Sequence, residues 1–232
     1  FRIEGVQKTH EVFSNGQQTK LGENSWEIQF PDYYTTSSFF LHVSDKGRFD
    51  VQRGTFQGVN GAIPVVAYAA SRDLSTKGLR RSLSILGELE DTFGPYAHSS
   101  LVAYITSGGG GMEHAGATIT SLWALGHEIT HSWFARGVMP ANGNSGWIDE
   151  AIASWRDEGY PRASSEPFRN PVQMSGFSPY RRHTSRAAYT LGMKLISEFD
   201  YMGRDFEYNG KAGMKGILSQ LFLRHARTSI TV

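Results

Sequence analysis

The five residues HEITH at positions 127–131 decide how this chain is interpreted. On an α-helix, residues four apart lie on one face, about one turn (~6 Å) from each other, so His127 and His131 can share one metal ion. Glu128 lies ~100° round the same helix, where its carboxylate can reach a water in an open coordination position of that metal. The pattern predicts a zinc site with His127 and His131 as ligands and Glu128 as the general base.

A third ligand is predicted at Glu150, in the segment WIDEA of residues 147–151. Residues 132–149 leave eighteen residues between His131 and Glu150, and glycines and a proline in this interval allow a second helix to turn back beside the first. Two histidines, one glutamate and a water form a recognised catalytic zinc set with an open position, in contrast to closed structural sites. One Zn2+ per chain is therefore the predicted cofactor.

The composition excludes several classes of protein. The chain has 232 residues, 39% of them hydrophobic and 19% charged, which is enough for one large domain or two smaller ones. Its net charge is +1, from 23 basic and 22 acidic residues, so it lacks the positive field that nucleic acid requires. It contains no cysteine, which excludes disulfides and thiolate ligands and leaves the compartment open.

No apolar run approaches the roughly 18 to 20 residues that cross a bilayer, so we expect a soluble chain without a transmembrane segment. The first residues show neither an initiator Met nor a signal-peptide pattern, and we expect that the N-terminus of a longer protein is missing. The oligomeric state cannot be predicted from these features.

The first 70 residues follow a β-type pattern, with short runs separated by turn residues. Strands are predicted at residues 25–30, 37–43, 47–52 and 63–70. Leucines at a spacing of three to four then predict a helix over residues 76–93, and the change of pattern suggests a boundary near residues 70–75.

The remainder mixes strands and helices. A strand is predicted at residues 101–105, before a glycine-rich run at 107–111. Helices are predicted at residues 119–135, 147–158, 187–201 and 212–226, and the first of these carries the HEITH motif. The expected fold class is α+β.

These motifs resemble the M1 family of zinc aminopeptidases. HEITHSWF at 127–134 is followed, after the eighteen-residue gap, by WIDE at 147–150, whereas thermolysin-type enzymes have a gap one residue longer. GGMEH at 110–114 is similar to the family's G-x-M-E-N exopeptidase motif, and AYTLG at 188–192 to its Y-x-x-G segment. Weaker similarity covers nearly the whole chain. The resemblance implies a thermolysin-like catalytic domain over residues 71–232, preceded by the C-terminal part of a β-sheet domain over residues 1–70.

The resemblance also implies roles for further residues. Glu113 would bind the α-ammonium of a peptide with a free N-terminus, and Tyr189 would donate a hydrogen bond to the oxyanion of the transition state. The substrate-binding set comprises Gly110, Gly111, Met112, Glu113 and His114. The glycine run would let an extended substrate pair with the backbone like an added strand.

Two positions depart from the family pattern: His114 stands where the family has Asn, and the gap from Glu150 to Tyr189 is short, which leaves Tyr180 as an alternative to Tyr189. The other histidines have no partner spacing and receive no role; they are His10, His42, His98, His183 and His225.

The leading hypothesis is a zinc aminopeptidase that removes N-terminal residues from peptides. Alternatives are a zinc endopeptidase, a hydrolase of a non-peptide substrate on the same site, and a non-catalytic M1-like binding scaffold. The preferred N-terminal residue and the physiological substrate cannot be read from the sequence.

Overall fold

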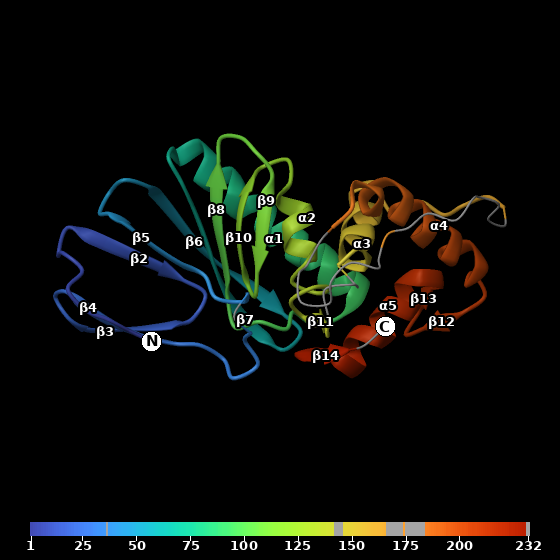
Figure 1. The fold of residues 1–232 in the computed structure, drawn as a ribbon, viewed down its shortest axis with the longest axis horizontal. Coiled ribbons are helices and arrows are strands. Elements are labelled where there is room, and N and C mark those ends of the chain that lie inside the picture. The colour runs from blue at the N-terminus through green and yellow to red at the C-terminus, as the bar shows by residue number, and fades with distance from the viewer. Residues whose placement is uncertain (36, 142–145, 166–173, 175–183, 231–232) are drawn as a thin grey trace. The chain divides into compact units, whose positions relative to one another are not determined.

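A computed structural model describes residues 1–35, 37–141, 146–165, 174 and 184–230 (Figure 1). Contacts divide the chain into two compact units, one formed by Phe1–Gly87 with His98–Ser132, the other by Glu88–Ala97 with Trp133–Val232. Helix α1 (Arg72–Phe93) contributes residues to both. Strands and helices are mixed along the chain, so the fold class is α+β, as predicted.

The first unit contains a five-stranded sheet of order β6-β7-β8-β10-β9. In that order the strands are Asp50–Gly58, Gly61–Ala69, Leu101–Thr106, Ala117–Ser121 and Gly111–His114. The pairs β7/β8 and β8/β10 are parallel, while β6/β7 and β10/β9 are antiparallel, and β9 forms an edge of the sheet. Strands from both sides of residue 70 share this sheet, and the domain boundary there stays a prediction.

Smaller sheets complete the first unit. One has the order β1-β4-β3, formed by Arg2–Ile3, Ser25–Gln29 and Gln17–Gly22. The other pairs β2 (His10–Ser14) with β5 (Leu41–Asp45). An aromatic core joins this pair to the five-stranded sheet: the rings of Phe13 on β2 and Tyr68 on β7 stack with centroids 3.9 Å apart. Such ring pairs add stability beyond the area that they bury.

The second unit is mainly helical. Its helical segments are α3 (Ile148–Asp157), the π-helix η2 (Ala188–Gly192), α4 (Met193–Met202) and α5 (Gly213–His225). Strand β11 (Val138–Pro140) pairs with β14 (Thr228–Ile230), and β12 (Glu207–Tyr208) with β13 (Lys211–Ala212). The helices predicted over residues 147–158, 187–201 and 212–226 are confirmed, the middle one beginning with a π-helical turn. Among the described residues, no helix combines the length and apolar character that crossing a bilayer requires.

Charged contacts attach α3 to the end of α1. Arg156 on α3 forms an ion pair with Glu88, and the Tyr160 hydroxyl donates to the same carboxylate at 2.7 Å. Burial raises the pKa of Tyr160, and its hydrogen bond to Glu88 adds to this, so the hydroxyl remains a donor at neutral pH. The orientation of α3, which carries Glu150, is thus supported within its own unit.

The helix predicted over residues 119–135 is wrong. Its first residues belong to strand β10, and the helix α2 covers only Leu125–Thr130. Thr118 and Thr120 are buried on β10, so the segment lacks the exposed alternate positions that reveal a strand in sequence. The helix ends in a tight turn, where the Ser132 N–H donates to Ile129 at 2.9 Å, and Ala135 adopts a φ of 127° that a helix cannot continue.

Candidate metal centre

Helix α2 presents two imidazoles together. His127 lies on it and His131 caps its C-terminal end, and their ring centroids are separated by 5.0 Å. His131 is 1% exposed and His127 is half-buried. Within the helix, the Thr130 hydroxyl donates to the Gly126 carbonyl at 2.8 Å, so this buried hydroxyl has a hydrogen-bond partner. The first unit therefore places two imidazoles side by side, where they could serve together as nitrogen ligands.

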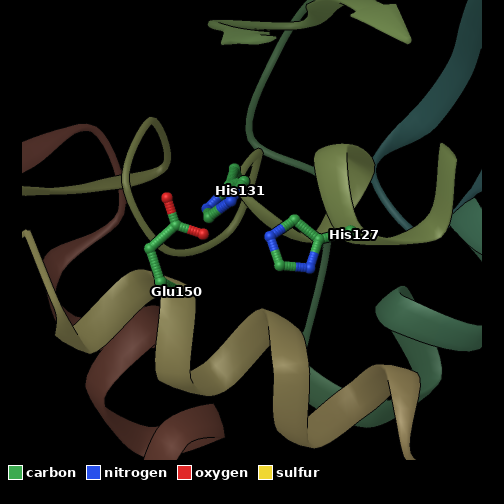
Figure 2. A group of neighbouring side chains, drawn as sticks. All are labelled: His127, His131 and Glu150. Carbon is green, nitrogen blue, oxygen red and sulfur yellow. The ribbon is translucent and has the colours of Figure 1, made fainter. Parts of the chain in front are cut away.

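Glu150 lies in the first turn of α3 and is 7% exposed. Its backbone N–H donates to Oδ1 of Asp149 at 3.1 Å. The Glu150 carboxylate points toward the two imidazoles (Figure 2), and each of the three side chains offers a ligand atom within 4.8 Å of the others. Two imidazole nitrogens and one carboxylate oxygen are a donor set that Zn2+ takes in catalytic sites, so the residues present fit this metal.

A second group brings the predicted base together with the predicted substrate anchor. Glu113, Glu128 and His131 are all buried, and each offers an atom within 4.8 Å of the others. All three belong to the first unit. Two carboxylates this close favour a cation between them, because each ionised group disfavours ionisation of the other. The group is therefore suited to a metal ion or to an ammonium group.

Strand β9 carries the glycine-rich motif along the edge of the sheet. Its register pairs Glu113 with Thr118 and Gly111 with Thr120 of β10. Glu113 is 7% exposed and Met112 is 52% exposed, as expected for residues on opposite faces of a strand. A Cβ on Gly111 would overlap the Glu128 carboxylate, so the Gly111 backbone lies directly against that group.

The remaining motif residues are Gly110, which precedes β9, and His114, which ends it. A Cβ on Gly110 would meet nothing within 4 Å, as for the two preceding glycines, so this backbone is open. His114 is partly buried, and its ring lies 5.4 Å from that of Phe40. The His114 side chain therefore packs against an aromatic ring of the first unit.

Tyr189 is the second residue of η2 and is 40% exposed. Three residues later, Gly192 lies so close to α3 that an added Cβ would be 2.8 Å from Cβ of Ala151. The Tyr-x-x-Gly spacing thus brings the Tyr189 turn against the residue that follows Glu150. π-Helical turns occur frequently at functional sites. The alternative residue, Tyr180, lies outside the described residues.

Two buried side chains near the motifs were not predicted. Asn15 is 1% exposed; its amide donates to the carbonyls of Ser38 and Ala115, both at 2.7 Å, and its oxygen accepts from the Phe40 N–H at 2.9 Å. The Tyr34 hydroxyl also donates to Ala115, at 2.8 Å, and burial raises the pKa of Tyr34. These bonds tie the end of β9 to the N-terminal segment.

The second unpredicted side chain is His98, whose ring nitrogens lie within hydrogen-bond distance of Tyr33 and Ser132. The partners of Asn15 and His98 lie up to 100 residues away in sequence, so no local pattern could identify either residue.

No protein-family model matches the sequence, and no curated protein matches it. Solved structures do match. An M1 zinc metallopeptidase from Deinococcus radiodurans superposes with a TM-score of 0.68 at 17% identity, covering 97% of this chain and 56% of that chain. A mutant of that metallopeptidase bound to a Tyr-Ser-Ala substrate gives 0.69 at 16%, with the same coverage.

Native yeast LTA4 hydrolase also matches, with a TM-score of 0.69 at 15% identity, covering 100% of this chain and 41% of that chain. The chain therefore spans between two fifths and three fifths of these structures. At these identities the likeness is one of fold: nearly the whole chain has the fold of the corresponding part of M1 zinc metallopeptidases.

Proposed function

We propose that this chain carries the active site of a zinc-dependent aminopeptidase of the M1 type. The observation that carries the proposal is the grouping of His127, His131 and Glu150 within 4.8 Å, with Glu113 and Glu128 buried around the same His131. The M1 metallopeptidase fold supports it independently.

In this proposal His127, His131 and Glu150 hold one Zn2+. When bound, the metal supplies an activated water and polarises the scissile carbonyl. Glu128 accepts the proton of the attacking water and returns it to the departing amine. Its burial against the Gly111 backbone restricts the carboxylate to few orientations, which suits a base that must act at one place. Tyr189 donates a hydrogen bond to the developing oxyanion.

The end of the peptide is recognised by β9. Glu113 pairs with the α-ammonium of the substrate, so that cleavage removes one residue. Strand β9 lies at an edge of the sheet, the position at which an extended peptide can add as a further strand. The solved metallopeptidase mutant bound to a Tyr-Ser-Ala substrate supports a peptide as the substrate class.

A non-peptide hydrolase is a second candidate, because yeast LTA4 hydrolase has the same fold. Substitution of Glu113 distinguishes an aminopeptidase from a non-peptide hydrolase and from an endopeptidase. For an aminopeptidase, Glu113→Ala lowers kcat/KM on free-amine substrates by about a hundredfold or more and leaves N-acetylated peptides unaffected. The matched control is Glu4→Ala, since Glu4 is exposed and forms its ion pair with Arg2, which is exposed as well.

The decisive experiment measures the metal content of the purified chain and its hydrolysis of a panel of aminoacyl chromogenic amides. Each assay is repeated after chelation and after zinc is returned. We expect about one zinc per chain and turnover that is lost and regained with the metal. Stoichiometric zinc with no turnover on any free-amine substrate would favour the non-peptide hydrolase or the scaffold. Absence of zinc binding would refute the proposed function.

A further inference from the structure

His98 is a buried histidine outside the residues assigned to catalysis. It is 1% exposed and connects two segments of the first unit that are distant in sequence. Its Nε2 lies 3.0 Å from the carbonyl oxygen of Ser132, and its Nδ1 lies 3.1 Å from the hydroxyl of Tyr33. Ser132 directly follows His131, so His98 reaches the metal-binding segment through its backbone.

The hydrogen-bond partners define the state of the His98 ring. A carbonyl oxygen only accepts, so Nε2 carries the hydrogen and donates to Ser132. In the neutral ring, Nδ1 then accepts a hydrogen bond from the Tyr33 hydroxyl. A neutral imidazole with one donor and one acceptor satisfies both partners, as a buried polar side chain should.

The Ser132 carbonyl lies where α2 needs support. Helix α2 has six residues, too few to be stable alone, so it depends on contacts of the residues around it. Ser132 closes the final turn by donating to Ile129, after which the chain leaves the helix. A tertiary hydrogen bond to its carbonyl therefore restrains the turn on which His131 is mounted.

The surroundings of His98 hold its ring in place. Tyr33 stacks on the ring with centroids 6.0 Å apart and Tyr34 meets it edge-on at 6.5 Å. Gly116 makes room for the side chain, because an added Cβ there would lie 3.0 Å from Cβ of His98 and 2.6 Å from the Ser100 carbonyl.

We propose that His98 is a positioning residue for the metal ligand His131, acting through the Ser132 carbonyl and oriented by Tyr33. The turn between β4 and β5 that contains Tyr33 thereby contributes to metal binding without supplying a ligand. This inference rests on the proposed zinc site, and it assigns to His98 a role in the affinity and geometry of that site rather than in chemistry.

The test compares His98→Leu, His98→Gln and Tyr33→Phe in the full chain. Zinc affinity is measured by competition with a chromogenic chelator, and the geometry of the site by the visible absorption of the Co2+-loaded protein. We expect His98→Leu to weaken zinc binding about tenfold or more and to alter the Co2+ bands, since loss of supporting hydrogen bonds has effects of that size. His98→Gln restores a donor toward Ser132 and should bind zinc within about threefold of the wild type. Tyr33→Phe should fall between the two.

His42→Leu is the matched control. His42 also lies in the first unit and its Nδ1 lies 2.9 Å from a tyrosine hydroxyl, that of Tyr68, but neither residue neighbours the metal-binding helix in sequence. It should lower the thermal midpoint of the apoprotein while zinc affinity and the Co2+ spectrum stay unchanged.

Three outcomes would overturn the role of His98 while leaving the zinc site intact. They are wild-type affinity in folded His98→Leu, equal losses in His98→Gln and His98→Leu, and an equal loss in His42→Leu. If His98→Leu does not fold, Tyr33→Phe and His98→Gln decide, and wild-type affinity in Tyr33→Phe together with full loss in His98→Gln contradicts the proposal. Failure of the wild-type chain to bind zinc overturns the proposed function, and this inference with it.

Discussion

At the scale of single residues, Glu128 shows how the site combines burial with proximity. It is 7% exposed, its carboxylate lies against the Gly111 backbone, and it shares a cluster with Glu113 and His131. Because the Glu128 carboxylate is shielded from bulk water and held in place, it suits proton transfer at one fixed position.

Glu128→Gln tests that role. The amide preserves shape and cannot accept the water proton, so we expect kcat to fall by about 10^2- to 10^4-fold while one zinc per chain is retained. The measurement is kcat at saturating substrate alongside metal content. Glu158→Gln, at the exposed end of α3, is the control and should leave both unchanged. A kcat within threefold of the wild type would exclude Glu128 as the base.

The residue scale also shows where sequence reasoning succeeds and where it stops. The spacing of His127 and His131 predicts a shared helix face, which the 5.0 Å separation of their rings bears out. Asn15 and His98 could not be predicted, because each is defined by hydrogen bonds to backbone groups brought close only by the tertiary fold. A lone polar residue in a sequence carries no sign of such partners.

At the scale of elements, the packing of η2 on α3 depends on a glycine. Gly192 allows the turn that bears Tyr189 to approach Ala151, the residue after Glu150. This close approach links the position of the proposed oxyanion donor to that of a proposed ligand.

Gly192→Ala should disturb both elements. The new methyl group would lie 2.8 Å from Cβ of Ala151, which cannot rotate away, so η2 or α3 must shift. We expect a loss of about 1–3 kcal/mol of stability, and a fall in kcat of one to two orders of magnitude, since small displacements of catalytic groups have effects of about that size.

The control is Gly87→Ala in α1, where the added Cβ would meet only one atom, at 3.8 Å. This substitution should stabilise the chain by about 0.5–1 kcal/mol, because alanine favours a helix interior over glycine. Stability is measured by denaturant titration and kcat by the amide assay. Equal behaviour of the two variants would show that the η2–α3 approach has no special role.

Prediction of elements from sequence was accurate where amphipathic periodicity was strong. The ranges of α1, α3 and α5 agree with the expected helices to within a few residues. Strand β3 was missed because all its residues are exposed, which removes the alternation that marks a half-buried strand. Strand β10 was wrongly included in a predicted helix for the opposite reason: most of its residues are buried, so it too lacks the alternation of a half-buried strand.

At the scale of the whole molecule, the proposed zinc ligands come from two segments of the chain, since eighteen residues separate His131 from Glu150. A ligand that binds only the folded state stabilises it by mass action, so metal binding should be visible in the unfolding of the chain.

Zinc at a hundredfold excess over its Kd should add ~2.7 kcal/mol to stability. For a chain of this size that corresponds to a rise of roughly 5–10 °C in the thermal midpoint. Glu150→Gln should abolish most of the rise, and Glu158→Gln should retain it. A full rise in Glu150→Gln that disappears in Glu113→Gln would instead locate the metal among Glu113, Glu128 and His131. Differential scanning calorimetry with and without zinc distinguishes the two sites.

The short turn between β9 and β10 limits how this part of the protein can change in length during evolution. Only Ala115 and Gly116 separate the two strands, and the register pairs His114 with Ala117. Because alternate residues of a strand face opposite sides of the sheet, a shift by one residue exchanges the faces of Met112 and Glu113. A one-residue deletion between Glu113 and the turn would therefore put the Met112 thioether on the buried face that the Glu113 carboxylate occupies. Insertions or deletions of an even number of residues at this place leave Glu113 on its face of the sheet. The number of residues gained or lost in this hairpin therefore matters by being even or odd as well as by its size.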